Sequence, residues 1–294
     1  MNKLLTELFA MPNPINYAIP FFLGSLLLEW WLTWREKHDS YDISDARASI
    51  LLGLGLLLFE IPGKVAALYC YNFVFQHRLF DIPLAFWSAI LLFLLDDFSY
   101  YWFHRFEHEH RFLWAGHESH HSSQEYNLAT ALRQPWAAAI YKYALWSWIV
   151  WLGFPPVWVF VSQALNLIYQ YWIHTKLIGK LPEWFELIFN SASHHRVHHG
   201  SNIRYLDRNH AGVLIIWDRM FGTFEPETEE VIYGLTQNIN TNNVLIIAFN
   251  EYYNLWIDIK AAPTLFDKFC YFWNAPGWSH DGSKKTTKQL RVGD

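Results

Sequence analysis

The sequence is poor in cysteine, in charged side chains, and in basic residues relative to acidic ones. Its 294 residues include two cysteines, Cys70 and Cys270, which form no CxxC pair, so a disulfide framework and a thiolate zinc finger are excluded. Charged residues make up 17% of the chain, against about 25% in typical soluble domains. Twenty-two Lys and Arg against 27 Asp and Glu give a net charge of −5. Without a basic stripe to neutralise phosphates, nucleic acid is excluded as an ordinary electrostatic partner.

Aromatic and apolar residues, by contrast, are abundant and lie in long runs. Aromatic side chains make up 19% of the chain and hydrophobic ones 52%, although the mean hydropathy is only +0.03. A helix needs about 20 mainly apolar residues to span a bilayer. We therefore predict spanning helices over residues 16–34, 50–74, 82–103, 136–152 and 155–173. Pro62-Gly63 is a candidate kink or break in the second, and Gly153–Pro156 is expected to turn the last two into a hairpin.

The predicted fold is all-α: a multi-pass integral membrane helix bundle with a cytosolic histidine-rich cap, forming a single domain over residues 1–294. The cap is assigned to residues 104–135 and 174–280. Three Lys or Arg in the 35–47 loop and three in the 104–135 stretch place both on the cytoplasmic side by the positive-inside rule. That membrane is the endoplasmic reticulum in a eukaryote or the inner membrane in a bacterium. A soluble all-α protein with very hydrophobic core helices is the alternative.

Histidine is the most informative residue type, because ten of the 15 histidines lie in two short stretches. Residues 104–121 hold six of them, in an HxxxH and an HxxHH motif, and residues 194–199 hold four, including a second HxxHH. On a helix, positions i, i+3 and i+4 share a face, so each motif projects its imidazoles together. The imidazoles on these faces are His104, His108, His117, His120, His121, His195, His198 and His199.

Eight imidazoles exceed the four ligands of one tetrahedral metal ion, so the pattern predicts two metals. Imidazole suits iron, zinc, copper and nickel. His174 ends the predicted hairpin at the same interface and is a ninth candidate ligand. His194, off the main face, and His210 and Asp218 are weaker candidates. Neutral imidazoles leave the metal charge in place, so nearby carboxylates must offset it; those available are Glu107, Glu109, Glu118, Asp97 and Asp218.

These motifs resemble those of the sterol desaturase / fatty acid hydroxylase superfamily of membrane di-iron enzymes. The flanking stretches are most similar to its alkylglycerol monooxygenase branch. They include WAGHESHHSSQEYNLATALRQ (114–134), YQYWIHT (169–175), SHHRVHHG (193–200) and NHAGVLIIWDRMFGTFEPE (209–227). One departure is His210, where the branch has tyrosine.

The resemblance implies two iron ions held by the box histidines and an O2-dependent lipid monooxygenase that hydroxylates an alkyl or acyl chain. In this branch the oxidised carbon adjoins an ether oxygen, so a glyceryl ether is cleaved, and tetrahydrobiopterin is the external reductant. Glu109 directly follows His108, where the ether-cleaving branch also has glutamate, and is therefore a candidate catalytic acid. Asp97, in the stretch that leads to His104, is the second. The implied partners are a membrane lipid, the bilayer and an electron donor.

Two alternatives remain. Acyl-chain or sterol hydroxylation, or desaturation, belongs to the same superfamily, and one oxidant performs either. A metal-binding membrane transporter belongs to a different class. Transport needs polar ligands near the bilayer midplane, whereas these histidines lie at the ends of the apolar segments and beyond.

Overall fold

The computed structural model describes residues 13–36 and 41–292, and within these ranges the fold is all-helical. Residues 37–40 of the predicted 35–47 loop lie outside the described residues. The longest helices are α2 (Pro14–Glu36), α3 (Ile43–Gln76), α4 (Phe86–Glu109), α8 (Pro156–Tyr171) and α12 (Val244–Ala261). Shorter helices are α5 (Arg111–His121), α6 (Ala138–Tyr141), α7 (Ser147–Leu152), α9 (Glu183–Ile188), α10 (Ala192–His198), α11 (Ile216–Phe221), α13 (Leu265–Trp273) and α14 (Thr287–Val292). Two 3₁₀ turns, η1 (Thr130–Leu132) and η2 (Lys142–Trp146), join them.

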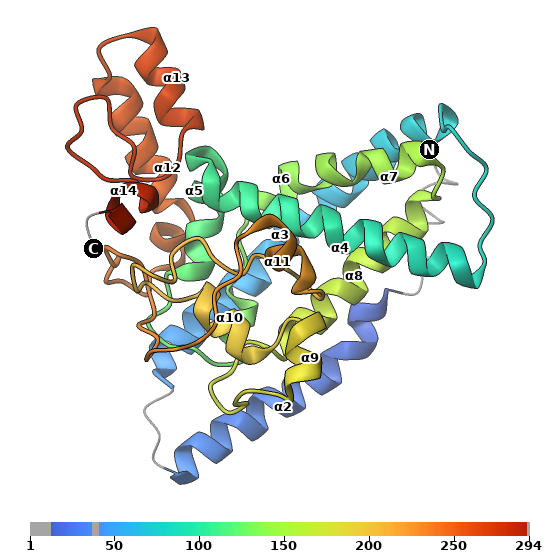
Figure 1. Cartoon of the computed structure of the whole chain (residues 1–294), viewed down its shortest axis with the longest axis horizontal. Helices are drawn as coiled ribbons and strands as arrows, with labels where there is room; N and C mark the ends of the chain where they lie inside the picture. Colours follow the sequence, from blue (N-terminus) through green and yellow to red (C-terminus); the bar gives the residue numbers. More distant parts are fainter. Residues whose placement is uncertain (1–12, 37–40, 293–294) are drawn as a thin grey trace.

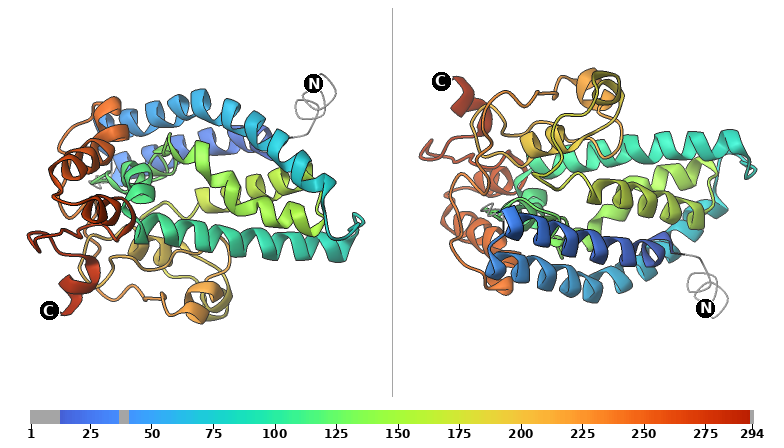
Figure 2. Two further views of the ribbon diagram at one scale, coloured as in Figure 1. Left: turned by 90° about the horizontal axis from the view of Figure 1, so that it is seen from above. Right: turned by 90° about the horizontal axis from the view of Figure 1, so that it is seen from below.

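The long helices run alongside one another and leave the histidine-bearing helices at one end. In Figure 2, α2 and α3 lie along one side and α4 along the other, with α6, α7 and α8 between them. The C-terminal helices α12 to α14 gather at one end, where α12 packs on α5, and the α3–α4 connection lies at the opposite end. In Figure 1, α5 and α10 lie in the left half of the view, on the side of α12, where α4 ends.

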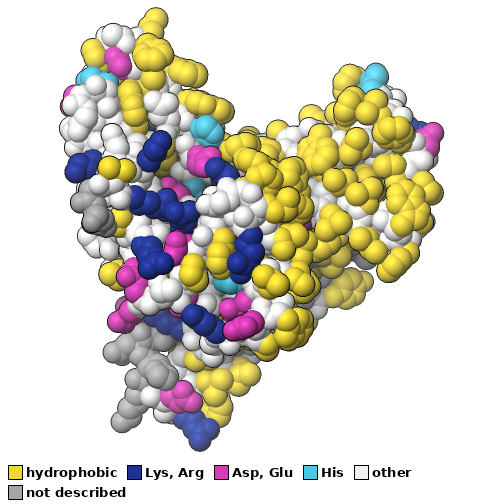
Figure 3. Space-filling view, in the orientation of Figure 1, with side chains coloured by type: hydrophobic (Ala, Val, Ile, Leu, Met, Phe, Trp, Pro, Cys, Tyr) yellow, Lys and Arg dark blue, Asp and Glu magenta, His cyan; other side chains and the backbone are white. Residues whose placement is uncertain are grey.

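Apolar surface is concentrated on the long helices. Two helices among the described residues, α2 with 23 residues and α3 with 34, are long and apolar enough to cross a membrane. Phe21, Leu58 and Phe86 are among the exposed apolar side chains of this half. Figure 3 shows apolar side chains covering the arm formed by α4, α7 and α8, whereas charged side chains gather on the opposite side of that view. Such a continuous apolar surface is typical of contact with lipid.

Helix α3 is longer than the predicted 50–74 segment because it begins at an N-cap. The Asp42 carboxylate accepts a hydrogen bond from the backbone N–H of Asp45, which starts the helix at Ile43. The helix then runs through Pro62 without a break. Gly63 fits against α6 at close range, since a Cβ there would lie 2.3 Å from the Ala139 carbonyl oxygen. The candidate break at Pro62-Gly63 is therefore a helix–helix contact.

The predicted single helix over 136–152 is wrong: this segment consists of α6, η2 and α7. The Tyr71 hydroxyl of α3 donates a 2.7 Å hydrogen bond to the carbonyl oxygen of Tyr143. That carbonyl is one that an α-helix would pair within its own chain. A side chain from a distant helix thus interrupts the ladder at the 3₁₀ turn, which a local pattern does not reveal.

A turn between α7 and α8 returns the chain toward the histidine-bearing end. Gly153 has φ +128°, and a Cβ there would lie 2.1 Å from the carbonyl oxygen of Phe80, so this position requires glycine. The backbone N–H of Leu79 bonds to the Trp151 carbonyl oxygen at 2.8 Å, which ties the turn to the α3–α4 connection. Helix α8 then packs on α2 and α4 and ends just before His174.

The core between α3, α4, α7 and α8 is apolar and aromatic. Tyr71, Phe103, Trp146, Ile149 and Phe160 are buried there in one cluster. Burying side chains of this size stabilises the helix contacts by about 2 kcal/mol each. The cluster fixes α4 against α8, so the last turns of α4 and the residue after α8 are held at the same end.

Candidate metal centre

Three helices and one loop residue supply the buried histidines. Helix α4 carries the HxxxH motif in its last turns, α5 carries the first HxxHH at its end, and α10 carries the second. His174 follows α8. All nine side chains are buried, although imidazole is polar and is usually half-exposed or exposed.

The nine imidazoles form two groups, each with ligand atoms within 4.8 Å of one another. The five-histidine group consists of His104, His108, His117, His121 and His198. The four-histidine group consists of His120, His174, His195 and His199. The structure therefore brings together every histidine of the three motifs, with His174 as the ninth.

Each HxxHH motif is divided between the two groups. On α5, His117 and His121 belong to the five-histidine group and His120 to the other; on α10, His195 and His199 belong to the four-histidine group. At about 100° per residue, positions i and i+4 lie about 40° apart, and position i+3 lies on the other side of i. The i and i+4 rings thus face one site and the i+3 ring faces its neighbour. The spacing predicted that the three rings of each HxxHH motif share a helix face. It did not predict that the i+3 ring belongs to a different group from the i and i+4 rings.

Backbone carbonyls orient four of the rings through their Nδ1 atoms. The four contacts join His104 to the His210 oxygen at 2.8 Å, His120 to Arg133 at 3.0 Å, His174 to Gln170 at 2.8 Å and His198 to Arg208 at 2.9 Å. A carbonyl oxygen only accepts hydrogen bonds, so each of these Nδ1 atoms carries the proton. The unprotonated Nε2 atom then faces the centre of its group, as a ligand atom does.

The Nε2 atoms of each group converge closely enough for one cation to contact several of them. His104 and His117 approach to 3.1 Å, and His174 approaches His195 at 2.9 Å. The Nε2 atoms of His108, His198 and His199 are buried with no hydrogen-bond partner among the described residues. Buried lone pairs without partners are costly. A metal ion in each group removes that cost, so these residues fit the two metals that the sequence predicts.

Burial keeps these rings in the form that binds metal. It lowers the pKa of His120 to about 4 and the pKa of His174 to about 3, both well below the usual value of 6.5. At neutral pH these two imidazoles are therefore uncharged, and neutral imidazole is the ligand form.

Asp97 and Asp218 hold the chain segment beside the five-histidine group. Asp97 is buried and accepts hydrogen bonds from the backbone N–H groups of Val213 and Leu214, at 2.8 and 2.9 Å. Asp218 accepts from the backbone N–H of His210 at 2.8 Å. The carbonyl of His210 in turn orients His104. Both carboxylates thus act on the site through the backbone and lie outside the two groups.

The remaining predicted residues lie beside the groups. Glu109 is on the outer side of α4, where its carboxylate forms a 2.7 Å ion pair with Arg105. His194 lies 3.9 Å from the Glu186 carboxylate and belongs to neither group. His210 lies next to the five-histidine group, 5.0 Å from His108 between ring centroids, and both its ring nitrogens lack a hydrogen-bond partner among the described residues.

One neighbour of the ligands was not predicted from the sequence. Asp207 lies 3.3 Å from Nδ1 of His108 and is in a left-handed conformation with φ +48°. It is 99 residues from His108 in sequence and carries no local signal, except that Asp tolerates positive φ better than most residues.

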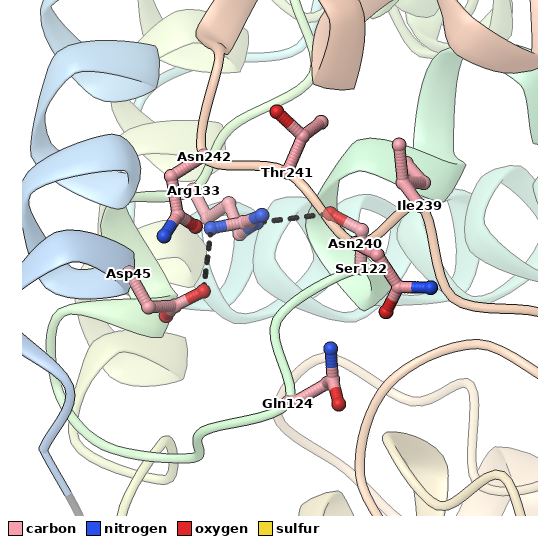
Figure 4. A pocket seen from close by; sticks show the side chains of 8 residues that line it. All are labelled: Asp45, Ser122, Gln124, Arg133, Ile239, Asn240, Thr241 and Asn242. Atoms are coloured by element: carbon pink, nitrogen blue, oxygen red, sulfur yellow. Dashed lines mark hydrogen bonds and ion pairs between the residues drawn. The ribbon is translucent and has the colours of Figure 1, made fainter.

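A polar pocket of about 140 Å³ lies beside the four-histidine group, next to the backbone that orients His120 (Figure 4). Its lining is polar apart from one residue and consists of Asp45, Ser122, Gln124, Arg133, Ile239, Asn240, Thr241 and Asn242. The Arg133 side chain is buried and forms a 3.1 Å ion pair with Asp45 of α3. It also donates to the Ser119 carbonyl oxygen of α5 at 3.0 Å. The pocket thus joins a predicted membrane helix to a ligand-bearing helix.

Comparison with known proteins assigns the domain. Residues 89–223 match the family model described as fatty acid hydroxylase, and this range includes all nine clustered histidines. This match assigns a fatty acid hydroxylase domain to these residues. The resemblance inferred from the histidine motifs is therefore confirmed.

The curated relatives of this hydroxylase domain extend beyond it. The chain is 43% identical to alkylglycerol monooxygenase of Homo sapiens over 91% of its own length, and 42% identical to that of Danio rerio over 92%. It spans 60% of the length of each. It is also 29% identical to an ornithine lipid hydroxylase of Rhizobium tropici, over 72% of this chain and 66% of that protein. No solved structure matches the chain.

Proposed function

We propose that this protein is a membrane-bound di-iron lipid monooxygenase that uses O2 to hydroxylate an alkyl or acyl chain and that cleaves glyceryl ethers. The observation that carries the proposal is the pair of buried imidazole groups within a fatty acid hydroxylase domain. Relatives named alkylglycerol monooxygenase point to the ether bond.

The proposed ligands are His104, His108, His117, His121 and His198 for one iron and His120, His174, His195 and His199 for the other. Bound iron supplies the activation of O2 that oxidises an unactivated C–H bond. The protein holds four of the nine rings by their Nδ1 atoms and keeps water away by burying all nine. Asp97 is proposed as a positioning residue for the His210 segment, and Glu109 as a functional acid on the outer, reductant side of α4.

We propose a multi-pass topology with the metal centre facing the cytoplasm. The helices α2, α3, α4 and the α7–α8 hairpin form the membrane part, and residues 104–135 and 174–280 form the cap. Cysteine labelling tests the sides, in a chain whose Cys70 and Cys270 are replaced by serine. A cysteine at position 81, which is exposed in the α3–α4 connection beside the Gly153 turn, should react with reagent added outside, and one at position 201 only after permeabilisation. The reverse pattern at either position contradicts this topology.

The substrate chain would enter from the bilayer between the apolar helices, and its polar headgroup would bind in the pocket lined by Arg133. That pocket offers a carboxylate from Asp45, amides from Asn240 and Asn242, and a hydroxyl from Ser122. Such a mixture of donors and acceptors suits a neutral headgroup with two hydroxyls.

The proposed reaction consumes one O2, two electrons and two protons. One oxygen atom enters the C–H bond beside the ether oxygen and the other leaves as water. The hemiacetal so formed separates into a fatty aldehyde and a glycerol. The electrons come from an external donor, and tetrahydrobiopterin is the first candidate.

The deciding experiment incubates membranes that contain the protein with an alkylglycerol and ¹⁸O2, with and without reduced pterin. Mass spectrometry should find a fatty aldehyde only when protein, O2 and reductant are all present. An alkylglycerol that stays intact with every reductant tested contradicts ether cleavage.

A second candidate is hydroxylation of an acyl chain without ether cleavage. The relative named ornithine lipid hydroxylase favours it. The same incubation with an acyl lipid distinguishes the two, because a hydroxylated lipid gains 18 mass units from ¹⁸O2 and releases no aldehyde.

A further inference from the structure

We propose that Glu107 is a positioning residue of the five-histidine group, which holds the Nδ1 proton of His117 and so turns Nε2 of that ring toward the metal. The inference rests on the proposed metal centre. In the sequence, Glu107 lies between the two acids proposed above, Asp97 and Glu109. Unlike them, its carboxylate contacts the ring of a proposed ligand.

His117 is oriented differently from the rings that backbone carbonyls hold. Its Nδ1 atom lies 3.3 Å from Oε2 of Glu107, within ion-pair distance, and has no hydrogen-bond partner among the described residues. The distance is at the long end for an N–H···O contact. Binding of a cation at Nε2 makes the Nδ1 proton more acidic, which strengthens its bond to a carboxylate.

Glu107 is placed where a carboxylate needs a positive charge nearby. It is 2% exposed, and in the described part of the chain no Lys or Arg forms an ion pair with it. An ionised carboxylate in so dry a place is unfavourable unless a charge offsets it. A metal ion on the far side of the His117 ring supplies that charge.

Tyr141 holds the other oxygen of Glu107. Its hydroxyl donates to Oε1 at 3.1 Å, so both carboxylate oxygens have a partner. The hydroxyl reaches this position because Gly116, one residue before His117, leaves room: a Cβ there would lie 2.5 Å from it. Glycine at position 116 therefore leaves the space that the Tyr141 hydroxyl occupies next to Glu107.

The test measures metal retention by the purified full chain in detergent and does not depend on lipid turnover. After iron loading, wild type, Glu107→Gln and Glu107→Ala are challenged with a chelator, and iron per chain is followed. Gln keeps an acceptor oxygen but no charge, whereas Ala keeps neither. We expect iron to be held about 10-fold more weakly by Glu107→Gln and about 100-fold more weakly by Glu107→Ala.

Matched controls separate this role from a packing role. Glu118→Gln removes a buried carboxylate next to His117 in sequence, one that accepts from Asn250 and touches no histidine ring in the described structure; it should retain iron like wild type. Tyr141→Phe should weaken iron binding, whereas Tyr143→Phe, which loses a hydroxyl bound to Glu60, should not.

The metal-free proteins provide the second measurement. A positioning role predicts that Glu107→Gln without iron melts at about the wild-type temperature, because glutamine has the shape of glutamate and keeps an acceptor oxygen, and that its melting temperature rises less than that of wild type on adding iron. Wild-type iron retention in both Glu107 variants, or equal loss of stability with and without iron, overturns the proposal. A wild-type chain that binds no iron overturns the metal centre itself, and this inference with it.

Discussion

The five-histidine and four-histidine groups share the two HxxHH motifs but lie among different charges. Glu107 and Asp207 each approach a ring of the five-histidine group to 3.3 Å. Among the described residues, no carboxylate lies within ion-pair distance of the four-histidine group. Burial, and to a smaller extent the guanidinium of Arg133, lowers the pKa of His120 in that group.

For the two proposed irons, this difference predicts a division of labour. Carboxylates beside ligand rings offset the positive charge of a bound metal and raise the basicity of the imidazoles. The five-histidine group should therefore hold its iron more tightly. The four-histidine group has fewer ligands and lies beside the polar pocket at Arg133, so it is the better position for a metal that faces the substrate.

The largest expected effect comes from removing one ligand on each side of this comparison. His120→Ala and His117→Ala should each abolish lipid oxidation, with a loss of at least about 100-fold, because both metals are required. They should differ in iron content. His120→Ala should keep close to one iron per chain, in the intact five-histidine group, whereas His117→Ala should keep less than one after a chelator wash. Elemental analysis of the purified proteins measures this.

A fully active variant with one metal per chain would contradict the di-iron proposal. His77→Ala serves as the control, because that ring is exposed and hydrogen bonds only to the Phe73 carbonyl. It should match wild type in both iron content and turnover.

The next largest effect is in the rate of iron release. Wild-type protein should lose iron to a chelator in two phases, with the four-histidine group releasing first and about 10-fold or more faster. Asp207→Asn should speed the slow phase only, and by less than Glu107→Gln, because Asp207 is 31% exposed and water screens its charge. Release in one phase would show that the two groups bind iron equally.

The sequence predicted that these histidines lie together because helical spacing is a local property. His104 and His108, or His117 and His121, share a face wherever the helix lies. What decides between the two groups is the relative placement of α5 and α10, which depends on packing between distant segments. The same limit applies to η2, where Tyr71 interrupts the helix at Tyr143, and to Asp207, which tertiary structure alone brings to His108.

The third prediction concerns the pH dependence of the four-histidine group in metal-free protein. The unfolded chain binds a proton at position 120 below pH 6.5, but the folded protein does so only near pH 4. The unfolded state therefore binds more protons in this window, and folding stability falls as the pH drops from about 6.5 to about 4. The melting temperature of wild type should fall over this range, and that of His120→Gln should fall less. Equal slopes would show that His120 is protonated in the folded protein.

The smallest expected effect tests whether the polar pocket beside the four-histidine group binds the headgroup. Asn240→Ala removes one amide from its wall. Loss of one hydrogen bond costs about 1 kcal/mol, so KM for an alkylglycerol should rise about 5-fold while kcat changes little. With an alkyl glycol, which lacks one hydroxyl, the variant and wild type should have similar KM values, because the lost partner is already missing. Asn202→Ala is the matched control, since its side chain bonds to Glu229 and Glu230 on the surface, outside the pocket. An equal rise in KM for both substrates would mean that Asn240 supports the fold of the pocket without binding the headgroup, and no rise for either would place the headgroup elsewhere.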